Sequence, residues 1–246
     1  GLRRPDPATL RELLRVGWPI GMTLGFEAGL FSVTALAMGL FGQQALAGHQ
    51  IAIQAASITF MVPVGLSIAT GVRVGQAAGR GDASAVRRAG LTGIAAAATV
   101  MLGTATLFRF APMLVVSAFL DPSDPRNVEV VRYATSFLAI AALFQVVDGV
   151  QVAASGALRG LRDTRVPMVI SLLAYWALGM TTSLLLGFAL DFGGRGLWAG
   201  LVVGLGVAAV LLTGRFLRLS TRAVRAPGGR AAAHAGVHSA PWERSS

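Results

Sequence analysis

The sequence contains no cysteine and no lysine, and only 13% of its 246 residues are charged. Without cysteine, this sequence can form no disulfide framework, thiol chemistry or thiolate metal site. Soluble domains carry about 25% charged residues. The low charge, together with 54% hydrophobic residues and a mean hydropathy of +0.66, therefore indicates an integral membrane protein. The 31 glycines agree with helices that pack closely in lipid.

The net charge of +10 is carried on the basic side by arginine alone. These arginines stand in short segments between apolar runs and not on an amphipathic face, which argues against nucleic acid as a partner. No signal peptide is visible, because the first apolar run follows a polar, arginine-bearing segment and is too long for the apolar core of a signal peptide. Because the sequence begins at Gly1 without methionine, we expect it to be the back part of a longer chain.

Six apolar runs have about the length that a bilayer requires, which is roughly 20 residues. They predict membrane spans over residues 16–41, 46–70, 89–108, 133–158, 166–189 and 196–217. Pro19, Gly21 and Gly25 predict a bend in the first span. A charged loop over 73–88 separates the second and third spans, and a turn-forming cluster over 121–125 precedes the fourth.

The predicted fold is all-α: a polytopic six-helix membrane bundle over residues 1–217, followed by a disordered tail over 218–246. Six spans place both ends of the chain on one side. Four of the 21 arginines fall on the opposite side, and the other 17 fall on the side of the termini; the four are Arg109, Arg126, Arg132 and Arg195. The positive-inside rule then predicts that both termini lie in the cytoplasm, and we expect a multi-pass protein of the plasma membrane.

Two acids, Glu27 and Asp148, lie within predicted spans, near the middle of their helices. A carboxylate at this depth is costly unless it is protonated, paired or bound to a cation. No arginine within a span is placed to neutralise either acid. Each is therefore expected to hold a proton or to bind a cation such as Na⁺, which suits an ion-coupled transporter.

Helical spacing arranges further polar residues in stripes on four of the spans. The candidate site residues are Glu27, Gln50, Gln54, Phe144, Gln145, Asp148, Gln151 and Tyr175. In lipid such stripes face a central cavity or one another. Plainer roles stay open: the acids as protonated hydrogen-bond donors between helices, and the glutamines and aromatic residues as packing.

Five segments, in order, resemble the multidrug and toxic compound extrusion (MATE) family. They are Pro19-Ile-Gly with Phe26-Glu27, Ala47-Gly-His-Gln-Ile-Ala52, Arg73-Val-Gly-Gln-Ala-Ala-Gly79, Phe144-Gln-Val-Val-Asp148 with Gly156-Ala-Leu-Arg-Gly-Leu-Arg-Asp-Thr-Arg-Val-Pro167, and Tyr175-Trp176. The resemblance covers about residues 10–217 and is to the second half of that family. It implies the C-terminal lobe of a twelve-helix transporter, whose missing N-terminal lobe is a partner across a drug-sized cleft.

The resemblance implies that Glu27 and Asp148 match the family's seventh- and tenth-helix acids, which are implicated in cation coupling. Phe144 stands where some Na⁺-coupled members carry tyrosine, so H⁺ coupling stays open beside Na⁺. The implied activity is secondary antiport: a small organic, often cationic compound leaves while Na⁺ or H⁺ enters. No enzyme activity and no cofactor are implied.

Three alternatives to this reading differ in their functional class. A flippase for lipid-linked precursors belongs to the same superfamily, but its cavity usually carries several cationic residues. An intramembrane aspartyl protease also uses two membrane acids, although its motifs differ from those around Glu27 and Asp148. A truncated remnant without transport activity is the third.

Overall fold

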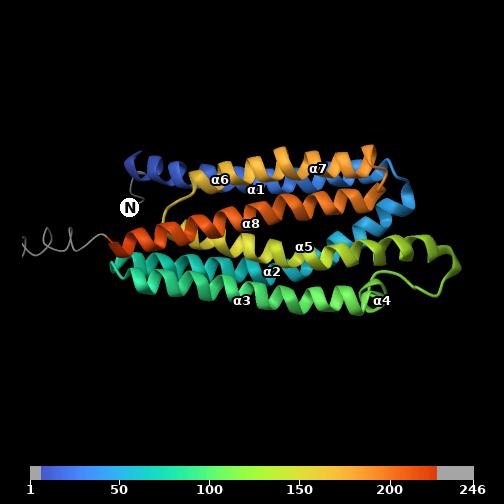
Figure 1. Ribbon diagram of the computed structural model, residues 1–246, viewed down its shortest axis with the longest axis horizontal. Helices are drawn as coiled ribbons and strands as arrows, with labels where there is room; N and C mark the ends of the chain where they lie inside the picture. The colour runs from blue at the N-terminus through green and yellow to red at the C-terminus, as the bar shows by residue number, and fades with distance from the viewer. Residues whose placement is uncertain (1–6, 226–246) are drawn as a thin grey trace, which may run out of the picture.

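The computed structural model describes residues 7–225, and this part of the chain is almost entirely helical (Figure 1). Its elements are α1 (Pro7–Gly39), α2 (Gln43–Gly79), α3 (Ala83–Phe110), α4 (Pro112–Val116), η1 (Pro125–Asn127), α5 (Val128–Gly160), α6 (Arg165–Leu172), η2 (Leu173–Met180), α7 (Thr181–Leu184), η3 (Leu185–Ala189) and α8 (Gly193–Arg225). Six stretches are long and apolar enough to cross a membrane, with α6 to η3 forming one of them. The predicted all-α, six-helix membrane fold is therefore confirmed.

Two predicted boundaries are wrong because the helices continue past the apolar runs. The predicted loop over 73–88 is helical except for a short turn, since α2 ends at Gly79 and α3 begins at Ala83. Arginine is a good helix former, and its long side chain can reach polar surroundings from inside a helix. The predicted disordered tail also begins too early, because α8 continues to Arg225. The rest of that tail, and the first six residues, lie outside the described residues.

Helix α5 is the centre of the bundle. In its apolar window 61% of the residues are buried, against 22% to 33% for α1, α2 and α3. Figure 1 shows α1 and the α6–η3 helix on one side, α2 and α3 on the other, and α5 and α8 between them. A residue on α5 is thus placed to contact several neighbouring helices.

Small residues let α2 and α5 approach to backbone contact. A Cβ atom on Gly156 would lie 2.4 Å from the carbonyl oxygen of Ser67, and one on Gly160 would lie 2.4 Å from that of Gly71. From the first contact to the second, the residue number rises by four on both α2 and α5, so the two helices run parallel. Only glycine fits at Gly156 and Gly160, and this close contact fixes where the end of α5 meets α2.

The fifth span differs from the regular helix that the sequence predicted. Wider π-helical turns form at η2 and η3. Small residues on this span pack against glycines of α8 in an antiparallel register: Gly179 on Gly204, Ser183 on Gly200 and Gly187 on Gly196. Each step is four residues on both helices. The two helices therefore approach closely along small residues at three successive levels.

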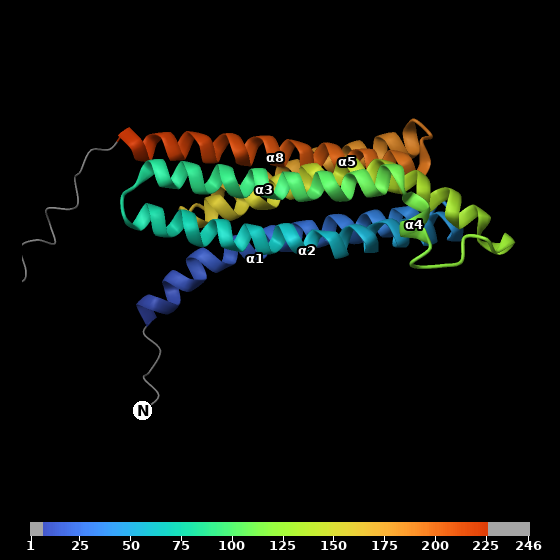
Figure 2. The ribbon, with the colours of Figure 1, turned by 90° about the horizontal axis from the view of Figure 1, so that it is seen from below.

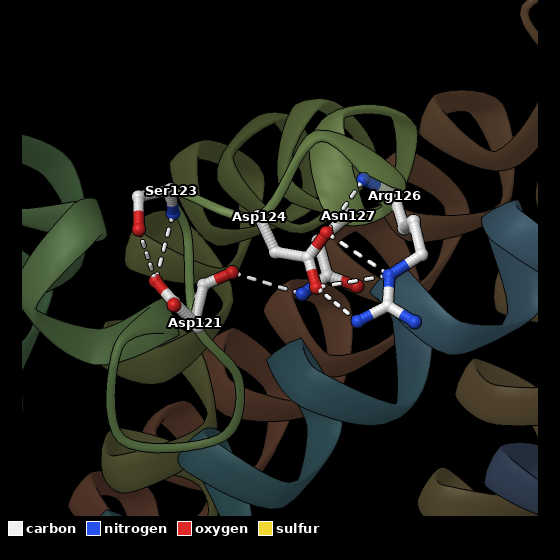
Figure 3. Close-up of polar contacts among 5 residues, drawn as sticks. All are labelled: Asp121, Ser123, Asp124, Arg126 and Asn127. Atoms are coloured by element: carbon white, nitrogen blue, oxygen red, sulfur yellow. Dashed lines mark hydrogen bonds and ion pairs between the residues drawn. The ribbon is translucent and has the colours of Figure 1, made fainter.

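A turn before α5 is closed by its own side chains (Figure 3). The Asp121 carboxylate accepts hydrogen bonds from the backbone nitrogen and hydroxyl of Ser123, at 2.9 and 2.6 Å. The Asp124 carboxylate accepts from the backbone nitrogen and guanidinium of Arg126, the latter at 2.7 Å from Nη2. The Asn127 amide donates to the Asp121 carbonyl at 2.9 Å. These bonds hold the turn that leads into α5.

The first turns of α1 leave the line of the remaining helix (Figure 2). Pro19 lies inside α1, and an internal proline removes a backbone hydrogen bond and bends a helix. The bend predicted for this span is therefore present. The beginning of α1 and the end of α8 lie at the same end of the bundle, as an even number of spans requires (Figures 1 and 2).

Candidate functional site

Three polar side chains form a row on the buried side of α5. Gln145, Asp148 and Gln151 follow at three-residue spacing, and all three are buried, with Asp148 only 3% exposed. Each has one oxygen without a hydrogen-bond partner in the described part of the chain: Gln145 Oε1, Asp148 Oδ1 and Gln151 Oε1. Buried polar atoms normally have partners, so the unpartnered oxygen of the buried Asp148 carboxyl marks a place that can accept a cation or a donor.

Neighbouring helices hold both amides of this row. Gln151 Nε2 donates to the Tyr175 hydroxyl on η2 at 2.6 Å. Gln145 Nε2 donates to the hydroxyl of Thr59 on α2 and, at 3.3 Å, to that of Thr104 on α3. Because the amide nitrogens donate to hydroxyls on neighbouring helices, the amide oxygens remain available as acceptors. Three different helices therefore position the row.

The second acid, Glu27, lies on α1 and is half-buried. It lines a pocket of about 530 Å³ between α1, α2 and α5, whose walls are mostly apolar. The charges of Glu27 and Asp148 are close enough to interact, and the Tyr175 hydroxyl interacts with both. The structure thus brings the two acids that the sequence singled out within electrostatic reach of each other and of the Tyr175 hydroxyl.

Arg159 belongs to the same pocket, and the sequence analysis missed it. Because α5 continues to Gly160, Arg159 lies in its last turn and not in a loop. Its Nη2 donates to the Ser67 hydroxyl at 2.8 Å, and that hydroxyl donates to the Val152 carbonyl at 2.7 Å. The guanidinium lines the pocket with Glu27, and the two charges interact.

The expectation that no arginine could neutralise either acid is therefore wrong for Glu27. The sequence did contain a signal. Arg159 follows Asp148 by eleven residues, which is close to three full helical turns, so both lie on nearly the same face of α5. Because the span was predicted to end at residue 158, Arg159 was assigned to the loop that follows.

Phe144 lies one turn before Asp148 and packs among aromatic rings. Its ring meets Phe31 at 5.9 Å and Trp198 at 5.6 Å between centroids, both edge to face. The residue is 2% exposed. Phe144 therefore makes an apolar wall beside Asp148, and the hydroxyl near the acids comes from Tyr175 instead.

Gln50 and Gln54 are exposed on α2, as is Ser57 of the same stripe. The structure does not bring these residues into the buried group around Asp148. Helical spacing identified the stripe correctly, but the side of α2 that it occupies is the outer one. Any role for these side chains concerns what contacts that outer face.

These features define a polytopic helical membrane protein with a carboxylate site at the centre of its bundle. The family model for MatE matches residues 19–185, and the chain belongs to this family. A probable multidrug resistance protein NorM of Deinococcus radiodurans is 51% identical over 217 residues, which are 88% of this chain and 48% of that protein. A protein of the same name from Pseudomonas aeruginosa is 49% identical, over 87% of this chain and 44% of its own length.

Solved structures show the same fold. An outward-facing multidrug resistance MATE family transporter of the MOP superfamily aligns with a TM-score of 0.79 and 20% identity, over 92% of this chain and 50% of its own. The eukaryotic MATE transporter AtDTX14 aligns with a TM-score of 0.73 and 24% identity, over 87% of this chain and 48% of its own. The chain spans about half the length of the curated relatives that it matches.

Proposed function

We propose that this chain is the cation-coupling half of a multidrug antiporter, which exports small organic, often cationic compounds against Na⁺ or H⁺. The buried Asp148 carboxyl, which has one unpartnered oxygen and lies within electrostatic reach of Glu27, carries the proposal. Na⁺ takes oxygen ligands, and H⁺ binds a carboxylate directly, so Asp148 can receive either ion. Relatives that are named as multidrug resistance proteins support the proposed role in drug export.

Arg159 gives the coupling site a resident positive charge. When no cation is bound, Arg159 partly offsets the negative charge of Glu27, which reduces the cost of a carboxylate in an apolar pocket. When the coupling cation binds, the two positive charges oppose each other. The site is therefore tuned to release its ion as well as to bind it, which a transport cycle requires.

Ion occupancy is coupled to shape through α1. Glu27 lies eight residues after Pro19, so the acid and the bend belong to one helix. A cation drawn between Glu27 and Asp148 pulls α1 toward α5, and the bent segment absorbs the change. A ligand shifts such an equilibrium only by its difference in affinity for the two shapes. The pocket beside Glu27 is where that difference arises.

The outer face of α2 is proposed to line the cleft between this half and a second six-helix half. Gln50 and Gln54 are exposed at one end of this face, and apolar Ile58 and Met61 are exposed further along it. A surface with both amides and apolar groups suits amphipathic organic substrates. Tyr175 is fully buried, so it acts with the acids and not as a wall of the cleft.

The proposed orientation has both termini in the cytoplasm of a plasma-membrane protein, and it rests on the arginine asymmetry between the two ends of the bundle. Because the sequence lacks cysteine, single cysteines can report it directly. Ser123→Cys, in the turn before α5, should react with a membrane-impermeant maleimide in intact cells. Ser84→Cys, beside the turn between α2 and α3, should react only after permeabilisation. The reverse pattern would refute the orientation.

The function is tested by efflux of a cationic dye from cells that express the protein in its natural full length. Asp148→Asn should abolish efflux under both an imposed Na⁺ gradient and an imposed H⁺ gradient, whichever of the two drives the wild type. Glu129→Gln is the matched control, because this exposed acid of α5 pairs with Arg132 at 2.6 Å outside the site. Folded wild type that exports no dye under either gradient would favour the flippase or remnant alternatives.

A further inference from the structure

Tyr175 is one of two tyrosines in the sequence, and it lies fully buried near the start of η2. A phenylalanine would fill the same apolar volume, whereas a buried hydroxyl is costly unless it forms hydrogen bonds. The Tyr175 oxygen accepts a hydrogen bond from Gln151 Nε2 at 2.6 Å. A hydroxyl that accepts one hydrogen bond still has its own hydrogen to donate. The hydrogen of Tyr175 therefore needs an acceptor of its own.

Two buried side chains near Tyr175 have an oxygen without a partner in the described part of the chain. These oxygens are Asp148 Oδ1 and Ser171 Oγ. Asp148 precedes Gln151 by about one turn of α5, and its charge acts on the Tyr175 hydroxyl. Ser171 precedes Tyr175 by about one turn, across the junction of α6 with η2. It lies close enough to influence Tyr175, although the two hydroxyls are not aligned as a hydrogen bond. Each oxygen is therefore a candidate acceptor for the Tyr175 hydrogen.

The two acceptors differ in charge, and only one of them changes when a cation binds. An ionised carboxylate accepts a stronger hydrogen bond than a neutral hydroxyl does. Because Asp148 is buried, its carboxylate needs such a donor whenever no cation is bound. When H⁺ or Na⁺ occupies the carboxylate, Asp148 becomes a poorer acceptor, while Ser171 Oγ is unchanged. The preferred acceptor of the Tyr175 hydrogen therefore depends on cation occupancy.

The charges around Tyr175 favour a donor role for its hydroxyl. The two charges that act on it belong to Glu27 and Asp148, and both are negative. A negative field turns the hydrogen of an O–H group toward the acids. Glu27 is half-buried and has Arg159 to oppose its charge, whereas the charge that acts on Asp148 is that of Glu27, which repels it. Of the two acids, Asp148 thus has the greater need of a donor.

The Tyr175 oxygen is held in place while its hydrogen can turn. The bond from Gln151 fixes the oxygen, so a change of acceptor requires only rotation about the C–O bond. A phenol hydrogen prefers the plane of the ring, which gives it two positions. The π-helical turn of η2 carries Tyr175, and such turns often occur at functional sites.

We propose that the Tyr175 hydroxyl is a two-position switch, which donates to Asp148 when no cation is bound and to Ser171 when one is. Gln151 is a positioning residue, because it acts through Tyr175. The inference rests on the cation site proposed above, and it adds that Tyr175 competes with the cation and does not ligate it. Its hydrogen bond lowers the cost of the cation-free carboxylate, so the switch promotes release of the ion.

The test measures cation affinity of the purified natural full-length protein. Na⁺ binding is followed by titration calorimetry at fixed pH, and H⁺ binding by the proton uptake that a pH indicator reports. Tyr175→Phe removes the competing donor, so the affinity for the cation that wild type binds should rise by about fivefold to tenfold. Ser171→Ala removes the acceptor used in the bound state, so that affinity should fall by about threefold to tenfold.

Two further measurements separate a switch from a structural role. With Tyr175 already changed to Phe, Ser171→Ala should cause no further change, since both residues act through one hydrogen. In infrared difference spectra with isotope-labelled tyrosine, cation addition should shift a tyrosine C–O band in wild type. The Tyr175→Phe variant should lack this shift. Loss of packing alone would produce neither result.

Each variant has a matched control within the chain. Tyr133→Phe changes the other tyrosine, which lies about four turns from the cation site on α5. Ser183→Ala removes a fully buried hydroxyl on the same span as Ser171, but this hydroxyl already donates to a backbone carbonyl of α8 at 3.0 Å. Both controls should leave cation affinity unchanged, even where Ser183→Ala lowers the melting temperature.

The outcomes separate the switch from the cation site on which it rests. Weaker binding in Tyr175→Phe would overturn the switch, because it would show that the hydroxyl ligates the cation. An unchanged affinity in either variant would overturn it too, as would an equal effect of Ser171→Ala with and without the Tyr175 hydroxyl. In these cases wild type still binds a cation, and the cation site stands. Folded wild type that binds neither Na⁺ nor H⁺ would refute the cation site and the switch together.

Discussion

Helices α2 and α5 carry similar polar stripes, but the structure uses them in opposite ways. Gln50 and Gln54 of α2 are exposed, whereas Gln145, Asp148 and Gln151 of α5 are buried. The difference follows from position in the bundle: α5 has neighbours on most sides, and α2 leaves much of its surface open. Spacing along a helix therefore identifies a polar stripe, while the number of neighbouring helices decides whether that stripe is interior.

The two stripes should differ in energetic demands. A buried amide must find hydrogen-bond partners, because an unpaired polar group away from water costs about 1–3 kcal/mol. An exposed amide carries no such requirement. The expected effects of substitution decrease from the shared contact of the two helices to the turn at the outer end of α5.

The largest effect is expected where α2 and α5 touch. Gly156→Val places a side chain where even a Cβ atom would lie 2.4 Å from the Ser67 backbone, so the helices must separate. We expect a loss of about 3 kcal/mol or more in the free energy of unfolding. Gly65→Ala on the outer face of α2, where nothing lies within 4 Å, should instead gain about 0.5–1 kcal/mol.

Both free energies can be measured by reversible unfolding in mixed micelles. Similar losses for the two variants would show that α2 has no distinct outer face. A Gly156→Val protein of unchanged stability would refute the close parallel contact that positions the end of α5.

The next contrast compares one glutamine from each stripe. Gln151→Leu removes the donor to the Tyr175 hydroxyl and should cost about 1–3 kcal/mol of unfolding free energy, because a buried hydroxyl loses its partner. Gln54→Leu, on the exposed face, should change stability by less than about 0.5 kcal/mol. Equal costs for the two substitutions would contradict the assignment of inner and outer stripes.

Much of the fold was predictable from the sequence because membrane spans are long, apolar and bounded by arginine. The number of spans and the bend at Pro19 follow from length and residue type, and Glu27 and Asp148 are recognisable as acids near the middle of apolar spans. These properties belong to single helices or to their order. They require no knowledge of which helix faces which.

The rest depends on contacts between helices. The direction of the α2 stripe, the π turns that hold Tyr175 against Gln151, and the closeness of Arg159 to Glu27 arise when helices pack. Arg159 was missed because a charged residue at the end of an apolar run usually marks the end of a span. Its guanidinium instead turns back onto Ser67, inside the last turn of α5.

Arg159 offers a third, smaller test. Arg159→Gln removes a positive charge that opposes a cation beside Glu27, so the cation concentration for half-saturation should fall by about threefold to tenfold. Arg132→Gln, on the exposed outer part of α5, is the control and should leave it unchanged. Binding can be followed by titration calorimetry with Na⁺ or by proton uptake. Weaker binding in Arg159→Gln would show that the arginine assists the cation and does not oppose it.

The smallest effect is expected at the turn before α5, far from the buried row (Figure 3). The hydrogen bonds from Arg126, first from its side chain and then from its backbone, lower the pKa of the half-buried Asp124 carboxyl below its ordinary value. A lowered pKa means that the carboxylate stabilises the turn above the ordinary aspartate range. That contribution is lost as the pH falls through the lowered value.

Hydrogen exchange of the Arg126 amide should therefore accelerate at acidic pH beyond its intrinsic pH dependence. Asp124→Asn should exchange faster at neutral pH and lose this extra dependence, because the ion pair is absent at every pH. Asp191→Asn, an exposed acid in the turn before α8, should behave as wild type. If Asp124→Asn also left exchange at the Arg126 amide unchanged, the side-chain bonds of the turn would not control how α5 begins, and α5 would owe its direction to packing within the bundle alone.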